Sequence, residues 1–141
     1  KRSAWRAKPV AREMITLAAI RRGLGRLCVV DTRTPEEHSG ALVRAARGGT
    51  IPGAVSVPYL SNLRGGMFRD PEALRAMYAA AGVTPEMDIV PLCNGGYRSA
   101  HTWLALRLAG FPRVRNYYAA WQEWGNRPDT PVRGPGAGGK R

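Results

Sequence analysis

Cys93 is the residue of this sequence best placed to do chemistry, because an apolar run ends at it and a glycine-rich loop begins there. The loop consists of Cys93, Asn94, Gly95, Gly96, Tyr97 and Arg98, and a helical pattern follows it to Gly110. Two successive glycines let the backbone curl, so that several N–H groups face the sulfur, and the following helix directs its positive end to the same point. Arg98 adds a full positive charge with a planar set of donors. Such a site stabilises a thiolate, which predicts a nucleophile.

The other cysteine, Cys28, has a different setting. It lies within the apolar run of residues 27–30, where a free cysteine behaves as a small apolar residue of a buried strand. We expect no disulfide, because Cys28 lies inside one strand and Cys93 lies past the end of another. Two cysteines also do not make the framework of a disulfide-rich fold.

The elements that must position Cys93 alternate along the chain. Helical signals separate four strand-like runs, at residues 27–30, 54–57, 89–92 and 114–117. We expect helices over residues 9–22, from Thr34, over residues 70–82 and from the Cys93 loop to Gly110. Thr34-Pro35-Glu36-Glu37 predicts a helix start with a capping box. The alternation predicts a three-layer α/β domain, with a parallel sheet of about five strands and helices on both faces.

The length and the hydropathy of the chain predict how it is organised into domains. With 141 residues it is long enough for one core. We therefore expect a single domain over residues 1–132 and a disordered Gly, Pro and basic tail over residues 133–141. No apolar run reaches the roughly 20 residues that cross a bilayer, so we expect a soluble, cytoplasmic protein without a membrane partner. Because residue 1 is Lys, we also expect a processed product or a piece of a longer protein.

The formal net charge of +12 lies mainly at the ends of the sequence. Residues 1–27 contain eight cations and one acid, whereas residues 28–129 contain eleven cations and nine acids. Basic ends are typical of solvated faces and tails, so we expect no nucleic-acid partner. A nucleic-acid or protein-binding module that uses the first 27 residues stays open as an alternative.

Four segments of the sequence resemble the rhodanese (thiosulfate sulfurtransferase) family, in its order and spacing. Residues 93–103 are similar to its active-site loop and following helix, and residues 30–37 to its Asp-x-Arg-x-Pro-Glu-Glu segment. Residues 49–54 and 121–125 are similar to its Gly-His-Ile-Pro-Gly-Ala and Trp-x-Glu-Trp signatures. The resemblance covers roughly residues 5–132 and is greatest to the catalytic, C-terminal domain of two-domain sulfurtransferases.

The resemblance has three departures. Thr50 stands where the family commonly has His, and Ala119-Ala120 replaces a frequent Gly-Ser pair. Asn94 stands where members that use thiosulfate often have a basic residue. The loop from Cys93 to Arg98 has the six-residue length of the sulfurtransferases, whereas the related phosphatases use one residue more. The presence of Arg98 also disfavours mercaptopyruvate as the donor.

The resemblance implies sulfur transfer through a Cys93 persulfide, with the loop residues Asn94 to Arg98 binding the substrate. The implied partners are a small anionic sulfur donor and a thiol or cyanide acceptor, with a protein thiol or a second domain as further partners. A regulatory rhodanese module that only binds a partner, or carries sulfur to it, is the alternative. We expect neither a metal nor another cofactor, because neither histidine has a metal-ligand spacing.

Three further groups of residues have side chains that could contribute to the site. Asp31 and Arg33 follow a strand end, where α/β folds place their sites, and we interpret them as supporting residues. A purely structural role, with Arg33 paired to Glu36 or Glu37, is the alternative. His101 is expected to be packed rather than a general base. Three tryptophans are expected to form core or pocket walls, namely Trp103, Trp121 and Trp124.

Overall fold

A parallel sheet forms the centre of the molecule. The computed structural model describes residues 4, 6 and 10–134, and residues 1–3, 5, 7–9 and 135–141 lie outside it. Strand β1 (Cys28–Asp31) lies between β2 (Val55–Ser56) and β5 (Ile89–Leu92), and both pairs are parallel. In register, Val30 of β1 stands beside Val55 of β2 and Pro91 of β5. Cys93 therefore follows directly from the strand at one edge of this sheet.

The sheet of about five strands that we expected is wrong, because only three strands form a continuous sheet in the described residues. The expected strand at residues 114–117 is present only as extended chain beside β5, with one bridge between Val114 and Ile89. The N–H groups of Arg115 and Tyr117 bind the carbonyls of Ile89 and Pro91. Pro91 has no N–H to return a bond, so the ladder is interrupted there.

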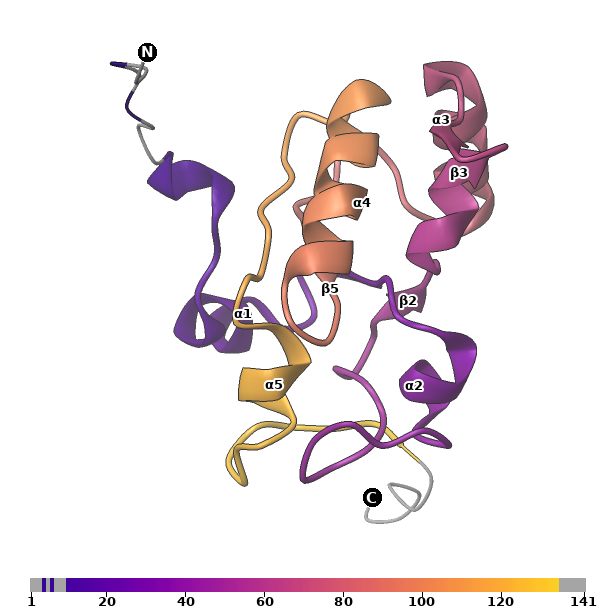
Figure 1. The fold of residues 1–141 in the computed structure, drawn as a ribbon. Helices are drawn as coiled ribbons and strands as arrows, with labels where there is room; N and C mark the ends of the chain where they lie inside the picture. The colour runs from indigo at the N-terminus through magenta and orange to yellow at the C-terminus, as the bar shows by residue number, and fades with distance from the viewer. Residues whose placement is uncertain (1–3, 5, 7–9, 135–141) are drawn as a thin grey trace.

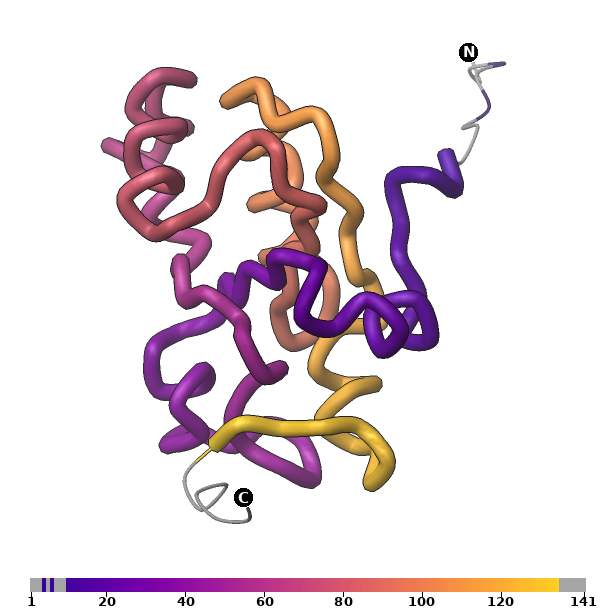
Figure 2. The backbone as a smooth tube through the Cα atoms, turned by 180° about the vertical axis from the view of Figure 1, so that it is seen from behind, coloured from indigo at the N-terminus to yellow at the C-terminus, as the bar shows by residue number. Residues whose placement is uncertain are grey.

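A fifth extended segment lies beyond this one. Met14 forms a parallel bridge with Asn116, and the two segments run side by side in Figure 2. The helix expected over residues 9–22 is consequently wrong in its first half. A short 3-10 turn, η1 (Ala11–Glu13), precedes the bridge, and α1 (Leu17–Gly23) starts only after it, capped by the Thr16 hydroxyl. Pairing with residue 116 stabilises extended backbone where the local pattern favoured a helix.

Alternation along β1 produces the layers, because neighbouring residues of a strand point to opposite faces. Val29 belongs to an apolar cluster with Ile20 of α1 and Trp124 of α5 (Ala120–Trp124). Val30 belongs to a second cluster that includes side chains of α3 (Pro71–Ala80) and α4 (Tyr97–Leu108). The expected α/β fold with helices on both faces is confirmed, and Figure 1 shows α3 and α4 apart from α1 and α5.

The remaining elements are short. The capping box predicted at Thr34 is present at the start of α2 (Pro35–Ser39), and α3 begins and ends close to the predicted positions. A 3-10 turn, η2 (Tyr59–Asn62), leads into a hairpin of β3 (Leu63–Arg64) and β4 (Met67–Phe68). Among the described helices, none is long and apolar enough to cross a membrane.

The C-terminal segment returns across the molecule toward α2. Arg133 exchanges two backbone hydrogen bonds with Thr50, so the paired structure extends into the segment expected to be a tail from residue 133. The rest of that expected tail, residues 135–141, lies outside the described residues. Figure 2 shows the described part of the C-terminal segment, which ends at residue 134, passing beside the loop that precedes Thr50.

Candidate functional site

Cys93 lies at the carboxyl end of β5, in front of the first turn of α4. Its side chain is only 1% exposed and packs in the same apolar cluster as Trp121. Although Cys93 is the first residue of a loop, its side chain is therefore buried. All four residues of β5 are buried, and Cys93, the next residue, is buried as well.

One backbone N–H of the loop, that of Gly96, faces the sulfur, where the two glycines predicted several. The Gly96 N–H donates to Cys93 Sγ over 3.0 Å, and Gly96 has a φ of 90°, which glycine adopts without strain. A Cβ at residue 96 would lie 2.6 Å from the Tyr118 carbonyl oxygen, so a larger residue does not fit. Gly96 is thus required both for the turn and for the close approach of Tyr118.

Helix α5 anchors the Cys93 loop from the opposite side. The Trp121 N–H donates to the Cys93 carbonyl over 2.9 Å, and the Gln122 N–H donates to the Asn94 carbonyl over 3.0 Å. Helix-start N–H groups have no partner within their own helix, so the loop carbonyls satisfy them. Ala120 enters this turn with a φ of 58° and is fully buried, which for a non-glycine residue costs on the order of 1 kcal/mol. That strain is tolerated beside the site.

A pocket of about 270 Å³ opens over the sulfur. Five of the six predicted loop residues line it, and Gly96 instead turns its N–H inward to the sulfur. Tyr97 stands at the rim and is 79% exposed, while the Asn94 Oδ1 atom is buried without a hydrogen-bond partner among the described residues. Gln122 also lines the pocket, and no local pattern of the sequence pointed to it. Its place depends on how α5 packs against the loop.

From the sequence we expected Arg98 to place a full positive charge at the sulfur. In the structure its charge is paired with a carboxylate. Its guanidinium donates to both carboxylate oxygens of Glu37, over 2.7 and 2.9 Å. Because the Glu37 carboxylate accepts these hydrogen bonds, the pKa of Arg98 is raised above its ordinary value, and the nearby Cys93 adds to the effect. Arg98 nevertheless lines the pocket beside Cys93, so its charge lies near the sulfur in a fixed direction.

Glu37 is the site residue that sequence reasoning missed. It is 1% exposed, it completes the capping box by accepting from the Thr34 N–H, and it lies 3.2 Å from Arg44 Nε. Burial by itself raises the pKa of Glu37, but hydrogen bonds from Arg98 and the Thr34 N–H lower it overall. The Thr34-x-x-Glu37 pattern located this carboxylate at the start of α2. Only the packing of α2 near α4 gave it a second partner.

Asp31 and Arg33 pair with each other away from the pocket. Arg33 donates to both carboxylate oxygens of Asp31, over 2.9 and 2.7 Å, and also to the Gly49 carbonyl. The alternative in which Arg33 pairs with Glu36 or Glu37 is therefore wrong, because its partner is Asp31. The Arg33 guanidinium lies 4.5 Å from the centre of a Trp121 ring, which links it to the helix that holds the Cys93 loop. Neither residue lines the pocket.

Asp31 is buried and has two further side-chain contacts. It accepts from the Thr50 hydroxyl over 2.7 Å and lies 3.0 Å from His38 Nδ1. Burial raises the pKa of Asp31, but hydrogen bonds from Arg33, His38 and Thr50 lower it far more. Thr50, the residue that departs from the family pattern, thus bonds directly to this carboxylate. The network joins the loop at residue 50 to Arg33, whose guanidinium lies over Trp121.

The remaining candidate residues have structural surroundings. His101 stacks on Phe68 with ring centres 4.6 Å apart, and burial lowers its pKa, which fits the packed histidine expected. Trp121 and Trp124 are buried core residues. Cys28 is partly buried in β1, where burial raises the pKa of its thiol. No group of three or more His, Cys, Asp or Glu side chains in residues 4, 6 and 10–134 is arranged to hold a metal ion.

These features define a class of protein: an α/β domain in which a cysteine, held by loop N–H groups, follows a parallel strand. The Rhodanese-like domain family matches residues 16–127, and the chain belongs to this family.

Two curated proteins are similar to this chain over more than three quarters of its length. The chain is 39% identical over 118 residues to the sulfur carrier protein TtuD of Thermus thermophilus, covering 77% of this chain and 41% of that protein. It is 41% identical over 119 residues to the thiosulfate sulfurtransferase of Azotobacter vinelandii, covering 79% and 42%. The matched part of the chain thus spans about two fifths of the length of these relatives.

Solved structures share the fold. The anaerobic ergothioneine biosynthesis enzyme from Chlorobium limicola superimposes with a TM-score of 0.79 and 23% identity, covering 87% of this chain and 32% of that one. At this identity the likeness shows the fold alone.

Proposed function

We propose that this domain transfers a sulfane sulfur through a persulfide on Cys93. The Cys93 thiolate attacks the outer sulfur of thiosulfate, the S–S bond of the donor breaks, and sulfite leaves with the bonding electron pair. Cyanide or a thiolate then attacks the outer sulfur of the persulfide. Thiocyanate or a new persulfide departs, and the Cys93 thiolate is regenerated.

One observation carries this proposal: the Gly96 N–H donates to Cys93 Sγ over 3.0 Å, and Cys93 lines the pocket. A buried sulfur beside oriented N–H groups and a helix start is stabilised as an anion without any rearrangement. A persulfide anion extends from the same atom toward the opening of the pocket. Two relatives named for sulfur transfer or sulfur carrying, at about 40% identity, support the same chemistry.

The charges around the pocket bear on the choice of donor. Asn94 is neutral, and the charge of Arg98 is shared with Glu37, so the pocket carries less net positive charge than an unpaired arginine would give. We therefore expect thiosulfate, with two negative charges, to be accepted with only a modest preference over an alkyl persulfide anion, which has one. A pocket of about 270 Å³ has room for either donor at its reacting end.

Mass spectrometry of the intact protein after incubation with thiosulfate tests the persulfide directly. We expect a gain of one sulfur atom, which cyanide then removes as thiocyanate. The gain should be absent in Cys93→Ser and retained in Cys28→Ser, because Cys28 lies within β1 and lines no pocket with the loop. A gain that persisted in Cys93→Ser would refute the assignment.

A second candidate function is a sulfur carrier that delivers the persulfide to a partner protein. The name of the Thermus relative favours it. A carrier would form the Cys93 persulfide as readily but release it slowly to cyanide and small thiols. Comparing the rate of persulfide formation with the rate of thiocyanate release, in single turnovers, separates the two candidates.

A further inference from the structure

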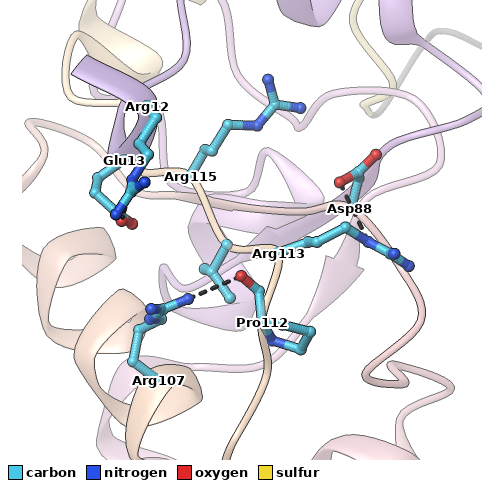
Figure 3. Close-up of a pocket in the computed structure, with 8 residues that line it drawn as sticks. Arg12, Glu13, Asp88, Arg107, Pro112, Arg113 and Arg115 are labelled. Atoms are coloured by element: carbon cyan, nitrogen blue, oxygen red, sulfur yellow. Dashed lines mark hydrogen bonds and ion pairs between the residues drawn. The ribbon is translucent and has the colours of Figure 1, made fainter. Parts of the chain in front are cut away.

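An arginine-rich surface lies at the end of the sheet opposite Cys93. Two adjoining hollows, of about 430 and 370 Å³, are lined by six arginines that we call the arginine face. These are Arg12, Arg22, Arg26, Arg107, Arg113 and Arg115. Asp88 and Arg115 line both hollows, so the two form one continuous surface. Figure 3 shows the larger hollow, with arginines entering from η1, α4 and the extended segment beside β5.

The carboxylates of this surface neutralise few of its arginines. Asp88 lies 3.6 Å from Arg113 and Glu13 lies 3.7 Å from Arg12, and both contacts are long, with both arginine side chains more than half exposed. In the part of the chain that the structure describes, four of the arginines have no carboxylate oxygen within 4.0 Å of their side-chain nitrogens, namely Arg22, Arg26, Arg107 and Arg115. The larger part of the positive charge is therefore available to a partner.

Some of these arginines are held in place by the fold itself. Arg107 donates to the Pro112 carbonyl over 2.8 Å, as Figure 3 shows, and Arg26 donates to the Arg22 carbonyl over 3.1 Å. These bonds orient the guanidinium groups but leave their charge unbalanced. Like charges held together repel one another, and a negatively charged partner relieves that repulsion.

The lining favours a protein partner over a nucleic acid. No lining residue of either hollow is aromatic, so the surface offers no platform on which bases could stack. Asp88 stands at the centre, between arginines, and would repel a continuous phosphate backbone. Val114 and Leu27 contribute apolar surface to the lining of the two hollows. Such a lining suits glutamate and aspartate side chains, in which methylene groups carry the carboxylate.

We propose that the arginine face is a docking surface for an acidic patch of a partner protein. Asp88 directly precedes β5 and Cys93 directly follows it, so a strand of four residues, roughly 13 Å long, separates the two sites. A partner bound at the arginine face leaves the Cys93 pocket open to donor and acceptor. The proposal rests on the surface alone and stands apart from the sulfur chemistry.

Two double variants that remove equal charge test the proposal. Arg22→Gln with Arg115→Gln changes the arginine face, and Arg64→Gln with Arg75→Gln changes exposed arginines elsewhere. The probe is a fluorescent peptide in which glutamate alternates with glycine, and its binding to the full chain is followed by fluorescence anisotropy. We expect the first double variant to bind about tenfold more weakly than the unchanged protein, and the second to bind almost normally.

Three results would overturn the proposal. Equal losses in the two double variants would mean that only total charge matters, and undetectable binding of the peptide would mean that the surface docks no acidic segment. Tighter binding of a single-stranded or double-stranded oligonucleotide of equal charge, lost in the first variant, would identify a nucleic-acid surface. Thiocyanate formation should be equal in both double variants, so a failure of the sulfurtransferase proposal is measured separately.

Discussion

Replacing Arg98 by alanine should damage both stability and sulfur transfer, and the structure separates the two effects. The substitution removes both hydrogen bonds from the buried Glu37 carboxylate. Glu37 keeps only the Thr34 N–H and the more exposed Arg44 as partners. A buried carboxylate without its main counter-charge makes the folded state less stable.

The size of each effect follows from these contacts. Breaking a fully buried ion pair costs about 3–5 kcal/mol, but Arg98 is 25% exposed and Arg44 remains, so we expect about 2–3 kcal/mol. In a domain of this size that lowers Tm by about 10 °C. The charge near the donor is shared with Glu37, so kcat/KM for thiosulfate should fall by about 10- to 30-fold, corresponding to roughly 1.4–2 kcal/mol.

A double-mutant cycle with Glu37→Gln isolates the part played by Arg98 at the pocket. In the Arg98→Ala background, Glu37→Gln removes the uncompensated buried charge while its amide oxygen still accepts from Thr34, so about 1–2 kcal/mol of stability should return. Thiosulfate turnover should not return, because the cation beside Cys93 is still missing. Thermal melts and steady-state kinetics with thiosulfate and an alkyl persulfide measure both quantities.

Two outcomes would refute this reasoning. An Arg98→Ala protein with an unchanged Tm would mean that the pair with Glu37 contributes nothing to folding. If thiosulfate turnover recovered together with stability in the double variant, Arg98 would act only by supporting the loop.

Three further predictions concern other contacts of the domain. Cys28→Ser should lower the free energy of unfolding by about 1 kcal/mol, since its site is partly buried, and should leave sulfur transfer unchanged; loss of turnover without unfolding would contradict this. Asp31 and Glu37 have depressed pKa values in the folded state, so the stability they contribute is present above about pH 4 and is lost as the pH falls further. Denaturant titrations from neutral to acid pH check this, and unchanged stability at roughly pH 3 would contradict it. Gly96→Ala should abolish persulfide formation, because its Cβ would collide with the Tyr118 carbonyl; a normal mass gain would show that the loop can adapt.

Local features of the site were readable in the sequence because they depend on neighbours along the chain. A strand, a cysteine, two glycines and a helix in succession predict how N–H groups face a sulfur, and the Gly96 N–H is found there. The capping box at Thr34 and the ends of α3 were readable for the same reason. So was the α/β class, since the alternation of elements limits how they can pack.

Tertiary packing decided what local patterns cannot contain. Glu37 and Arg98 are 61 positions apart, and they meet only because α2 and α4 lie near one another in the folded domain. The burial of Cys93 depends on α5, which covers the loop from almost thirty residues further along the chain. Pairing of Met14 with Asn116 likewise replaced half of an expected helix. The sequence therefore determined which residue is the candidate nucleophile and how its loop turns, whereas packing between distant segments determined which charges surround it.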